Sequence, residues 1–201
     1  MANRLVLLLH GWRTPPPDHW QLWLAPRAYE RGWEVDFPRL PEADTPTLSR
    51  WLPVVQARVA RVPRAAELVV LAHCCGALTW MHHAAVLGGR DRRVDRVLLV
   101  APPGRRWRHP DLSGMPYPPL DGWSLRRAAG VTRLVAGVDD PWGGVAETTS
   151  LGRALGVEVD VVPEGRHLDP EAGFGPWPQV LDWLIDPAAA DLNTARRSTP
   201  R

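Results

Sequence analysis

Short apolar runs rich in β-branched residues recur along the chain, and stretches of helical length separate them. Most of the runs are nearly continuous rather than alternating, which is typical of strands that are covered on both faces. This alternation predicts an α/β fold: a three-layer α/β/α sandwich with a mostly parallel sheet of about six strands. The expected strands lie at residues 4–10, 33–38, 67–72, 94–101, 131–138 and 157–162, and the expected helices at 18–32, 45–62, 75–89, 143–156 and 176–186.

The length of the chain favours a single domain. With 201 residues, of which 45% are hydrophobic and 23% charged, one compact core is expected over residues 1–187. Residues 102–126 interrupt the alternation with prolines, glycines and aromatic residues, so we predict an irregular insertion there that caps the functional site. Residues 188–201 hold one large apolar residue, Leu192, and are expected to form a disordered tail.

Composition and charge argue against several functional classes. The formal net charge of +2 is too small for a surface that tracks phosphates, so nucleic acid is not expected as a partner. The apolar run 5–9 is too short to span a membrane and lacks a signal-peptide cleavage pattern, so we expect a cytoplasmic protein with no membrane partner. The two cysteines are adjacent in sequence, which disfavours both a structural disulfide and a zinc site, and we predict no metal or other cofactor.

The segment Ala72-His73-Cys74-Cys75-Gly76 lies between an expected strand and an expected helix. In α/β-hydrolases this position carries the motif G-x-S-x-G, whose serine is the nucleophile on a sharp turn. Small residues are needed two positions before and two positions after the nucleophile, because the strained turn brings the strand and the helix close together. Ala72 and Gly76 meet this requirement, which puts Cys74 at the nucleophile position. The alternative is a buried cysteine that only packs.

An acid and a base follow Cys74 in the order that this fold requires. Asp140 comes after the strand expected at 131–138, and His167 comes after the strand expected at 157–162. A nucleophile, an acid and a histidine in this order, at the C-terminal ends of strands, form a catalytic triad. The backbone N–H groups of Trp12 and Cys75 are the expected oxyanion hole.

The chain resembles the short α/β-hydrolases that include retinoblastoma-binding protein nine and the bacterial YdeN-like serine hydrolases. The resemblance covers nearly all of residues 4–186 and depends on the segments LLHGW, DHWQLWL, SRWLPVV, AHCCGAL, GVDDPW and GRH. It implies a minimal α/β-hydrolase fold, without the two leading antiparallel strands of larger relatives. It also implies a triad of Cys74, Asp140 and His167, with cysteine where that family has its serine.

A thiol at the nucleophile position predicts a particular chemistry. A nearby histidine converts a thiol to a thiolate, which attacks acyl carbons well. We therefore predict cleavage of an ester, thioester or lactone through a thioacyl-enzyme intermediate, in specialised natural-product metabolism. One alternative is an acyltransferase, or a condensing or cyclising enzyme, that passes the acyl group to an amine, thiol or carbon acceptor. Further alternatives are a non-catalytic binding module on a hydrolase fold and a redox role for the adjacent cysteines.

The tryptophans indicate a class of substrate. The chain has 11 tryptophans and only 2 phenylalanines, and Trp12, Trp107, Trp123 and Trp142 lie in or near the loops expected around the site. Tryptophan side chains there favour a small-molecule substrate with a hydrophobic or aromatic acyl group. The arginines of the segment 105–108 are candidates for contact with a carboxylate, a phosphate or a carrier protein.

Overall fold

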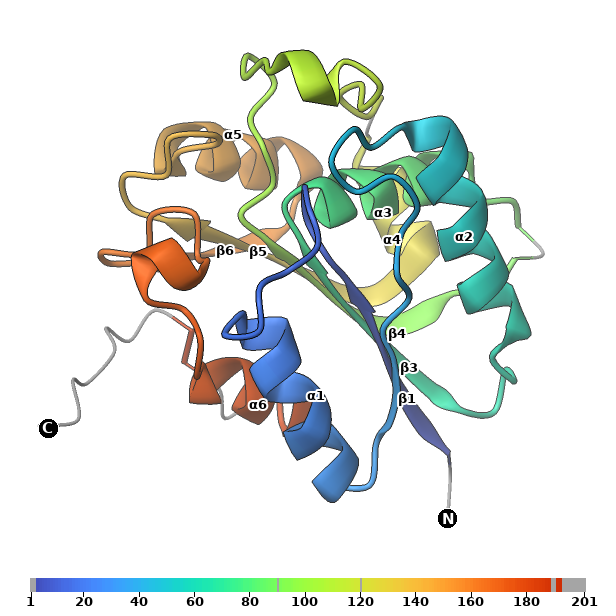
Figure 1. The fold of residues 1–201 in the computed structure, drawn as a ribbon. Helices are drawn as coiled ribbons and strands as arrows, with labels where there is room; N and C mark the ends of the chain where they lie inside the picture. The colour runs from blue at the N-terminus through green and yellow to red at the C-terminus, as the bar shows by residue number, and fades with distance from the viewer. Residues whose placement is uncertain (1–2, 90, 120, 189–190, 193–201) are drawn as a thin grey trace, which may run out of the picture.

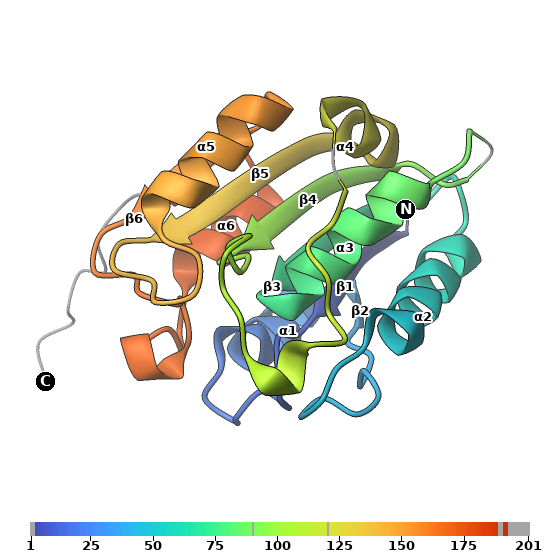
Figure 2. The ribbon, with the colours of Figure 1, turned by 90° about the horizontal axis from the view of Figure 1, so that it is seen from above.

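The computed structural model describes residues 3–89, 91–119, 121–188 and 191–192. In this part of the chain six strands form one sheet in the order β2-β1-β3-β4-β5-β6, and every neighbouring pair is parallel. Helices cover both faces of the sheet (Figure 1, Figure 2), so the predicted three-layer α/β/α sandwich is confirmed. The strands are β1 (Arg4–Leu9), β2 (Glu34–Asp36), β3 (Glu67–His73), β4 (Val94–Val100), β5 (Ala129–Gly137) and β6 (Glu158–Val162), and the helices are α1 (Trp20–Glu30), α2 (Leu48–Arg61), α3 (Cys75–Val86), α4 (Gly122–Ala128), α5 (Val145–Leu155) and α6 (Pro178–Ile185).

The two faces of the sheet carry separate halves of the core. Along β1, Leu5, Leu7 and Leu9 pack on the side of α2, α3, α4 and α5, whereas Val6 and Leu8 pack on the side of α1 and α6. Successive side chains of a strand point to opposite faces, so a strand buried on both faces needs apolar residues at every position. None of the helices in the described part of the chain is both long and apolar enough to cross a membrane.

The direction of winding reverses between β1 and β3. The chain leaves β1 through α1 to the edge strand β2, returns through α2 to β3 on the other side of β1, and then continues outward to β6. At such a reversal, the connections that follow two adjacent parallel strands leave on opposite faces of the sheet, and a crevice opens between them. The segments that begin at His10 and Cys74 meet at this crevice, so the fold brings the candidate site residues to one edge of the sheet.

The segment that the sequence predicts to be irregular ends in a helix. α4 begins at Gly122, and the carboxylate of the preceding Asp121 accepts hydrogen bonds from the backbone N–H and the hydroxyl of Ser124. The helix has only 7 residues, too few to show helical periodicity, and leads directly into β5. The prediction for 102–126 is therefore wrong from Gly122 onward. Between residues 102 and 121, the described part of the chain contains only one short helical turn, the 3-10 helix Pro110–Leu112.

Leu192 in the C-terminal segment is docked on the core. Leu192 is fully buried in the half of the core that faces α1 and α6, so the predicted disorder of the tail 188–201 is wrong at this residue. Residues 189–190 and 193–201 of the predicted tail lie outside the described residues. Burial of a leucine gives the chain beyond α6 an attachment that its polar composition does not reveal.

Gly76 allows α3 to begin against the end of β1. A Cβ atom at this position would lie 2.6 Å from the carbonyl oxygens of both Leu9 and His10. These backbone atoms cannot move aside without shifting β1, so we expect Gly76→Ala to lower the free energy of unfolding by about 1–3 kcal/mol. Gly89→Ala is the control, because a Cβ atom there meets nothing within 4 Å. Thermal unfolding followed by circular dichroism measures both variants, and equal melting temperatures would contradict the prediction.

Candidate active site

Cys74 occupies a sharp turn, the elbow, between β3 and α3. Its backbone has φ 51° and ψ −120°, a conformation that costs energy for a residue with a Cβ atom and persists only where neighbours fix it. The N–H of Cys74 donates to the carbonyl of Val100, and its own carbonyl accepts from the N–H of Ala77. Gly11 packs directly against the elbow, because a Cβ atom there would lie 2.7 Å from the Cβ atom of Cys74. The elbow thus holds the thiol next to the chain that leaves β1.

His167 and Asp140 form a buried pair in the loops that follow β6 and β5. Nδ1 of His167 lies 3.1 Å and 3.0 Å from the two carboxylate oxygens of Asp140. The backbone N–H of Trp142 donates to the same carboxylate over 2.9 Å. A carboxylate only accepts hydrogen bonds, so Nδ1 carries a proton and Nε2 is left for proton exchange. Nε2 is buried and has no hydrogen-bond partner among the described residues, which leaves it available to a reacting group.

His73 supports the loop that carries His167. Its Nε2–H donates to the backbone carbonyl of His167 over 3.0 Å, and the two ring centroids lie 5.0 Å apart. Burial and the neighbouring charge of His167 lower the pKa of His73 to about 3, so this imidazole is neutral. The side chain of His73 therefore bonds to the backbone of the His167 loop rather than to the thiol.

The charges of Cys74 and His167 stabilise each other. Burial raises the pKa of the Cys74 thiol, but the Cys75 thiol and the cationic His167 outweigh this effect and hold the pKa well below its usual value. Burial lowers the pKa of His167, but the negative charge of Cys74 and the hydrogen bond to Asp140 raise it to about 10. The two shifts together favour a thiolate–imidazolium pair at neutral pH.

Cys75 adds a second thiol beside the first. The two Sγ atoms are 3.9 Å apart, and both cysteines are free thiols. The hydrogen bond to Cys74, together with burial, raises the pKa of Cys75 well above its usual value. Cys75 therefore stays protonated and donates its S–H to the sulphur of Cys74. In the described part of the chain, no three side chains of His, Cys, Asp or Glu are grouped to hold a metal ion.

The backbone N–H groups of Trp12 and Cys75 lie near the sulphur of Cys74. The N–H of Trp12 interacts with both thiols, and Cys75 supplies the first N–H of α3. The first N–H groups of a helix have no partner within it and suit a negatively charged oxygen. His10 fixes the loop that carries Trp12, since its Nδ1–H donates to the carbonyl of Gly11 over 2.8 Å. The structure brings both predicted donors together, and their role as an oxyanion hole stays a prediction.

Three of the four tryptophans predicted to bind substrate form an aromatic wall at the site. The ring centroid of Trp142 lies 4.0 Å from that of His167, and Trp107 stacks on Trp142 at 5.3 Å. The centroid of Trp12 lies 6.1 Å from that of Trp142 and 4.4 Å from that of His109. His109 is the member of this wall that sequence reasoning missed, because a single histidine in an irregular segment carries no recognisable pattern.

Trp123 does not join the aromatic wall. It lies at the start of α4, near the amino end of β5, whereas Cys74 follows the carboxyl end of β3. Its side chain is 68% exposed, and the guanidinium of Arg126 lies over its ring at 5.0 Å from the centroid. The fold therefore separates Trp123 from the other three tryptophans, and the structure corrects its assignment to the pocket.

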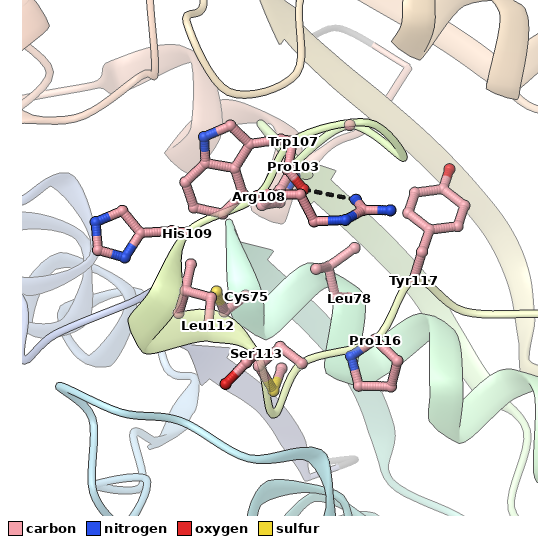
Figure 3. Close-up of a pocket in the computed structure, with 12 residues that line it drawn as sticks. Cys75, Leu78, Pro103, Trp107, Arg108, His109, Leu112, Ser113, Pro116 and Tyr117 are labelled. Atoms are coloured by element: carbon pink, nitrogen blue, oxygen red, sulfur yellow. Dashed lines mark hydrogen bonds between the residues drawn. The ribbon is translucent and has the colours of Figure 1, made fainter.

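An inner cavity of about 320 Å³ opens beside the elbow (Figure 3). The side chain of Cys75 lines it, although the sequence predicts only a backbone role for this residue. Most of the lining is apolar, which suits the hydrocarbon part of a ligand. The other lining residues are Leu78, Pro103, Gly104, Trp107, Arg108, His109, Leu112, Ser113, Met115, Pro116 and Tyr117.

Residues 102–119 and 121, here called the cap segment, cover the inner cavity and cross above α3 (Figure 2). Hydrogen bonds join the backbone of the cap segment to helices α2, α3 and α5. The bonded pairs are Gly114 O with Leu48 N (2.9 Å), Pro116 O with His82 Nε2 (2.8 Å) and Arg105 N with Glu147 Oε1 (2.5 Å). The cap segment is thus docked on three helices, at Arg105, Gly114 and Pro116.

The sequence matches the model of a known family over most of its length. The family model described as serine hydrolase matches residues 6–186. The chain belongs to the serine hydrolase family. It is therefore a hydrolase of the α/β superfamily, with a cysteine at residue 74. No curated protein matches the sequence significantly.

Solved structures share the fold of this serine hydrolase. The ydeN gene product from Bacillus subtilis is 21% identical, with a TM-score of 0.78 over 92% of this chain and 97% of that chain. A putative YdeN-like hydrolase from Pectobacterium atrosepticum is 24% identical, with a TM-score of 0.72 over 92% and 90% of the two chains. Est1E from Butyrivibrio proteoclasticus with ferulic acid bound is 16% identical, with a TM-score of 0.63 over 93% and 88%. These similarities establish the minimal α/β-hydrolase fold.

Alkylation by iodoacetamide is expected to distinguish the two cysteines of this hydrolase. The pKa of Cys74 is lowered and that of Cys75 is raised, so limiting reagent at neutral pH should modify Cys74 alone. An ordinary thiol loses about tenfold in thiolate for each unit of pH below its pKa, whereas Cys74 should keep its reactivity well below neutral pH. Intact-mass spectrometry and peptide mapping over a range of pH measure both effects.

His167→Ala removes the cation that stabilises the Cys74 thiolate. The pKa of Cys74 should then rise, and alkylation at neutral pH should slow by on the order of tenfold or more. His109→Ala is the control, because His109 belongs to the aromatic wall but is not paired with Asp140. Equal alkylation rates in the wild type and in His167→Ala would show that the thiol is not activated by this histidine.

Proposed function

We propose that Cys74, His167 and Asp140 form a catalytic triad that cleaves an ester, thioester or lactone through a thioacyl-enzyme intermediate. The observation that carries this proposal is the position of Cys74 on a strained elbow, where it is electrostatically coupled to a buried histidine that Asp140 orients. Structural cysteines in a core need neither the strained backbone nor a charged partner. Nucleophilic cysteines need both a fixed position and a base.

The first half of the cycle transfers the acyl group to sulphur. The Cys74 thiolate attacks the carbonyl carbon, a C–S bond forms, and the carbonyl electron pair moves to oxygen. The N–H groups of Trp12 and Cys75 stabilise the resulting oxyanion. When the oxyanion collapses, the bond to the leaving group breaks, and His167 gives its Nε2 proton to that group.

The second half releases the acid. Neutral His167 takes a proton from water, and the hydroxide attacks the carbonyl carbon of the thioester. Collapse of this second oxyanion breaks the C–S bond and returns the electron pair to Cys74. His167 is left protonated, so the thiolate–imidazolium pair of the resting enzyme is restored. Asp140 stabilises the imidazolium at each stage without exchanging a proton.

The surroundings of Cys74 favour a hydrophobic or aromatic acyl group. The inner cavity beside Cys75 is lined mainly by apolar side chains, and the aromatic wall stands over His167. Aromatic side chains contact flat apolar groups at low entropic cost because they have few rotatable bonds. We therefore propose a small-molecule substrate with such an acyl group, and a role for the enzyme in natural-product metabolism.

Acyl transfer is the second candidate function. A thioester reacts readily with amine and thiol acceptors as well as with water, and His167 is buried beside the aromatic wall. The acceptor would then give its proton to His167 in place of water. The exposed arginines of the cap segment, Arg105, Arg106 and Arg108, suit the phosphate of a carrier-protein arm. Product analysis with added amines and thiols separates the two reactions, since free acid as the only product excludes transfer.

A covalent acyl-enzyme is the expected outcome of brief incubation with activated esters and thioesters. Intact-mass spectrometry should show a mass increase equal to one acyl group in the wild type and none in Cys74→Ala. Cys75→Ala is the matched control: it keeps the backbone N–H, so it should still gain the acyl mass. A variant Cys74→Ala with full activity would favour the binding-module alternative and contradict the triad.

Asp140→Asn is expected to reduce kcat/KM by on the order of 10²–10⁴-fold. The amide can no longer stabilise the imidazolium, and its NH₂ group favours the wrong tautomer of His167. Asp139→Asn is the matched control, because Asp139 is the exposed neighbour of the buried Asp140. Steady-state kinetics with an activated ester compare the variants, and similar losses in both would contradict the assignment of Asp140.

A further inference from the structure

Two cavities adjoin at Tyr117. The inner cavity of about 320 Å³ is lined on its α3 side by Cys75 and Leu78. A larger outer groove of about 770 Å³ extends over α5, and its apolar lining includes Leu151 and Leu155. Tyr117 lines both spaces and is half-buried. Its ring is therefore part of the partition between them.

The position of Tyr117 relative to the elbow is fixed by α3. The carbonyl of the preceding residue, Pro116, accepts a hydrogen bond from Nε2 of His82 over 2.8 Å. His82 follows Cys75 in α3 by two turns, which is about 10 Å along the helix axis. Leu78 lies between them on the helix, and Figure 3 shows its side chain between Cys75 and Tyr117. The inner cavity thus runs along α3 from the elbow to Tyr117.

Tyr117 and Arg108 both line the inner cavity. Nη1 of Arg108 donates to the carbonyls of Arg105 and Trp107 over 2.6 Å and 2.7 Å, which fixes this side chain to the backbone of the cap segment. Burial and the negative charge of Glu147 raise the pKa of Tyr117, so the phenol is uncharged at neutral pH. An uncharged ring is suited to close an apolar space.

The volume of the inner cavity limits the size of its ligand. In other proteins an apolar cavity of about 150 Å³ holds one benzene molecule. The inner cavity has about twice that volume, enough for one ring with its linker, or for a short aliphatic chain. Longer acyl groups would have to pass Tyr117 to reach the outer groove.

We propose that Tyr117 closes the far end of the acyl-binding cavity and so limits the substrate to acyl groups with a single ring or a short chain. The inference rests on the proposed function, because the acyl group enters this cavity from its bond to Cys74. Replacing Tyr117 by a small residue joins the inner cavity to the outer groove. The enzyme would then accept longer acyl groups without any change at the elbow.

The test is the chain-length profile of acylation. A series of activated thioesters with acyl groups from acetyl to dodecanoyl, plus benzoyl and phenylpropanoyl, is presented to the wild type, Tyr117→Ala and Tyr117→Phe. Values of kcat/KM and intact-mass measurements of the acyl-enzyme are recorded for each. We expect Tyr117→Ala to raise the ratio of kcat/KM for long over short groups by at least about tenfold, as expected when a few buried methylenes gain contacts. Tyr117→Phe keeps the ring and should retain the wild-type profile.

A second pair of variants protects the test against misfolding and indirect effects. Tyr117→Val should shift the profile in the same direction as Tyr117→Ala. Adding Leu151→Trp to Tyr117→Ala narrows the outer groove and should reduce the gain in kcat/KM for the longest acyl groups. An unchanged profile in both small-residue variants would overturn the role of Tyr117 while leaving the proposed function intact. Absence of acylation by any member of the series in the wild type would instead overturn the proposed function, and the size limit with it.

Discussion

The strained backbone of Cys74 is the constraint on which the rest of the site depends. A positive φ at a residue with a Cβ atom is tolerated only when the structure around it leaves no alternative. Gly11 and Gly76 create that situation, because both positions approach neighbouring atoms too closely for any side chain. The end of β1, the end of β3 and the start of α3 therefore lock together at one point. The fold holds the thiol beside two backbone N–H groups at the expense of local strain.

The parallel sheet supplies the remaining partners from distant parts of the chain. Asp140 and His167 follow β5 and β6, and they reach Cys74 because all carboxyl ends of the strands meet at the same edge. Hydrogen bonds then set their orientation, from Trp142 to Asp140, from His167 to Asp140 and from His73 to the His167 backbone. His73 is neutral, whereas the neighbouring His167 is cationic. Burial and hydrogen bonding thus give two adjacent imidazoles different protonation states.

The sequence predicts most of the fold, because buried parallel strands are apolar at every position and stand out between the helices. The order of Cys74, Asp140 and His167 after three strands is equally visible, since topology alone brings strand ends together. Details that depend on side-chain packing could not be predicted from the sequence. α4 is too short to show a period, Trp123 is separated from the site by the length of β5, and His109 acquires neighbours only through the path of the cap segment.

The attachment of the cap segment to three helices determines when the conformational entropy of this segment is lost. A mobile lid loses conformational entropy when it closes over a ligand, and that loss weakens affinity. Here Gly114, Pro116 and Arg105 bond to helices α2, α3 and α5 of the same chain, so the cap segment loses this entropy when the protein folds. The shape of the pocket is consequently a property of the helix packing. A core substitution that tilts α2 or α3 would reshape the ligand site without touching a single residue that lines it.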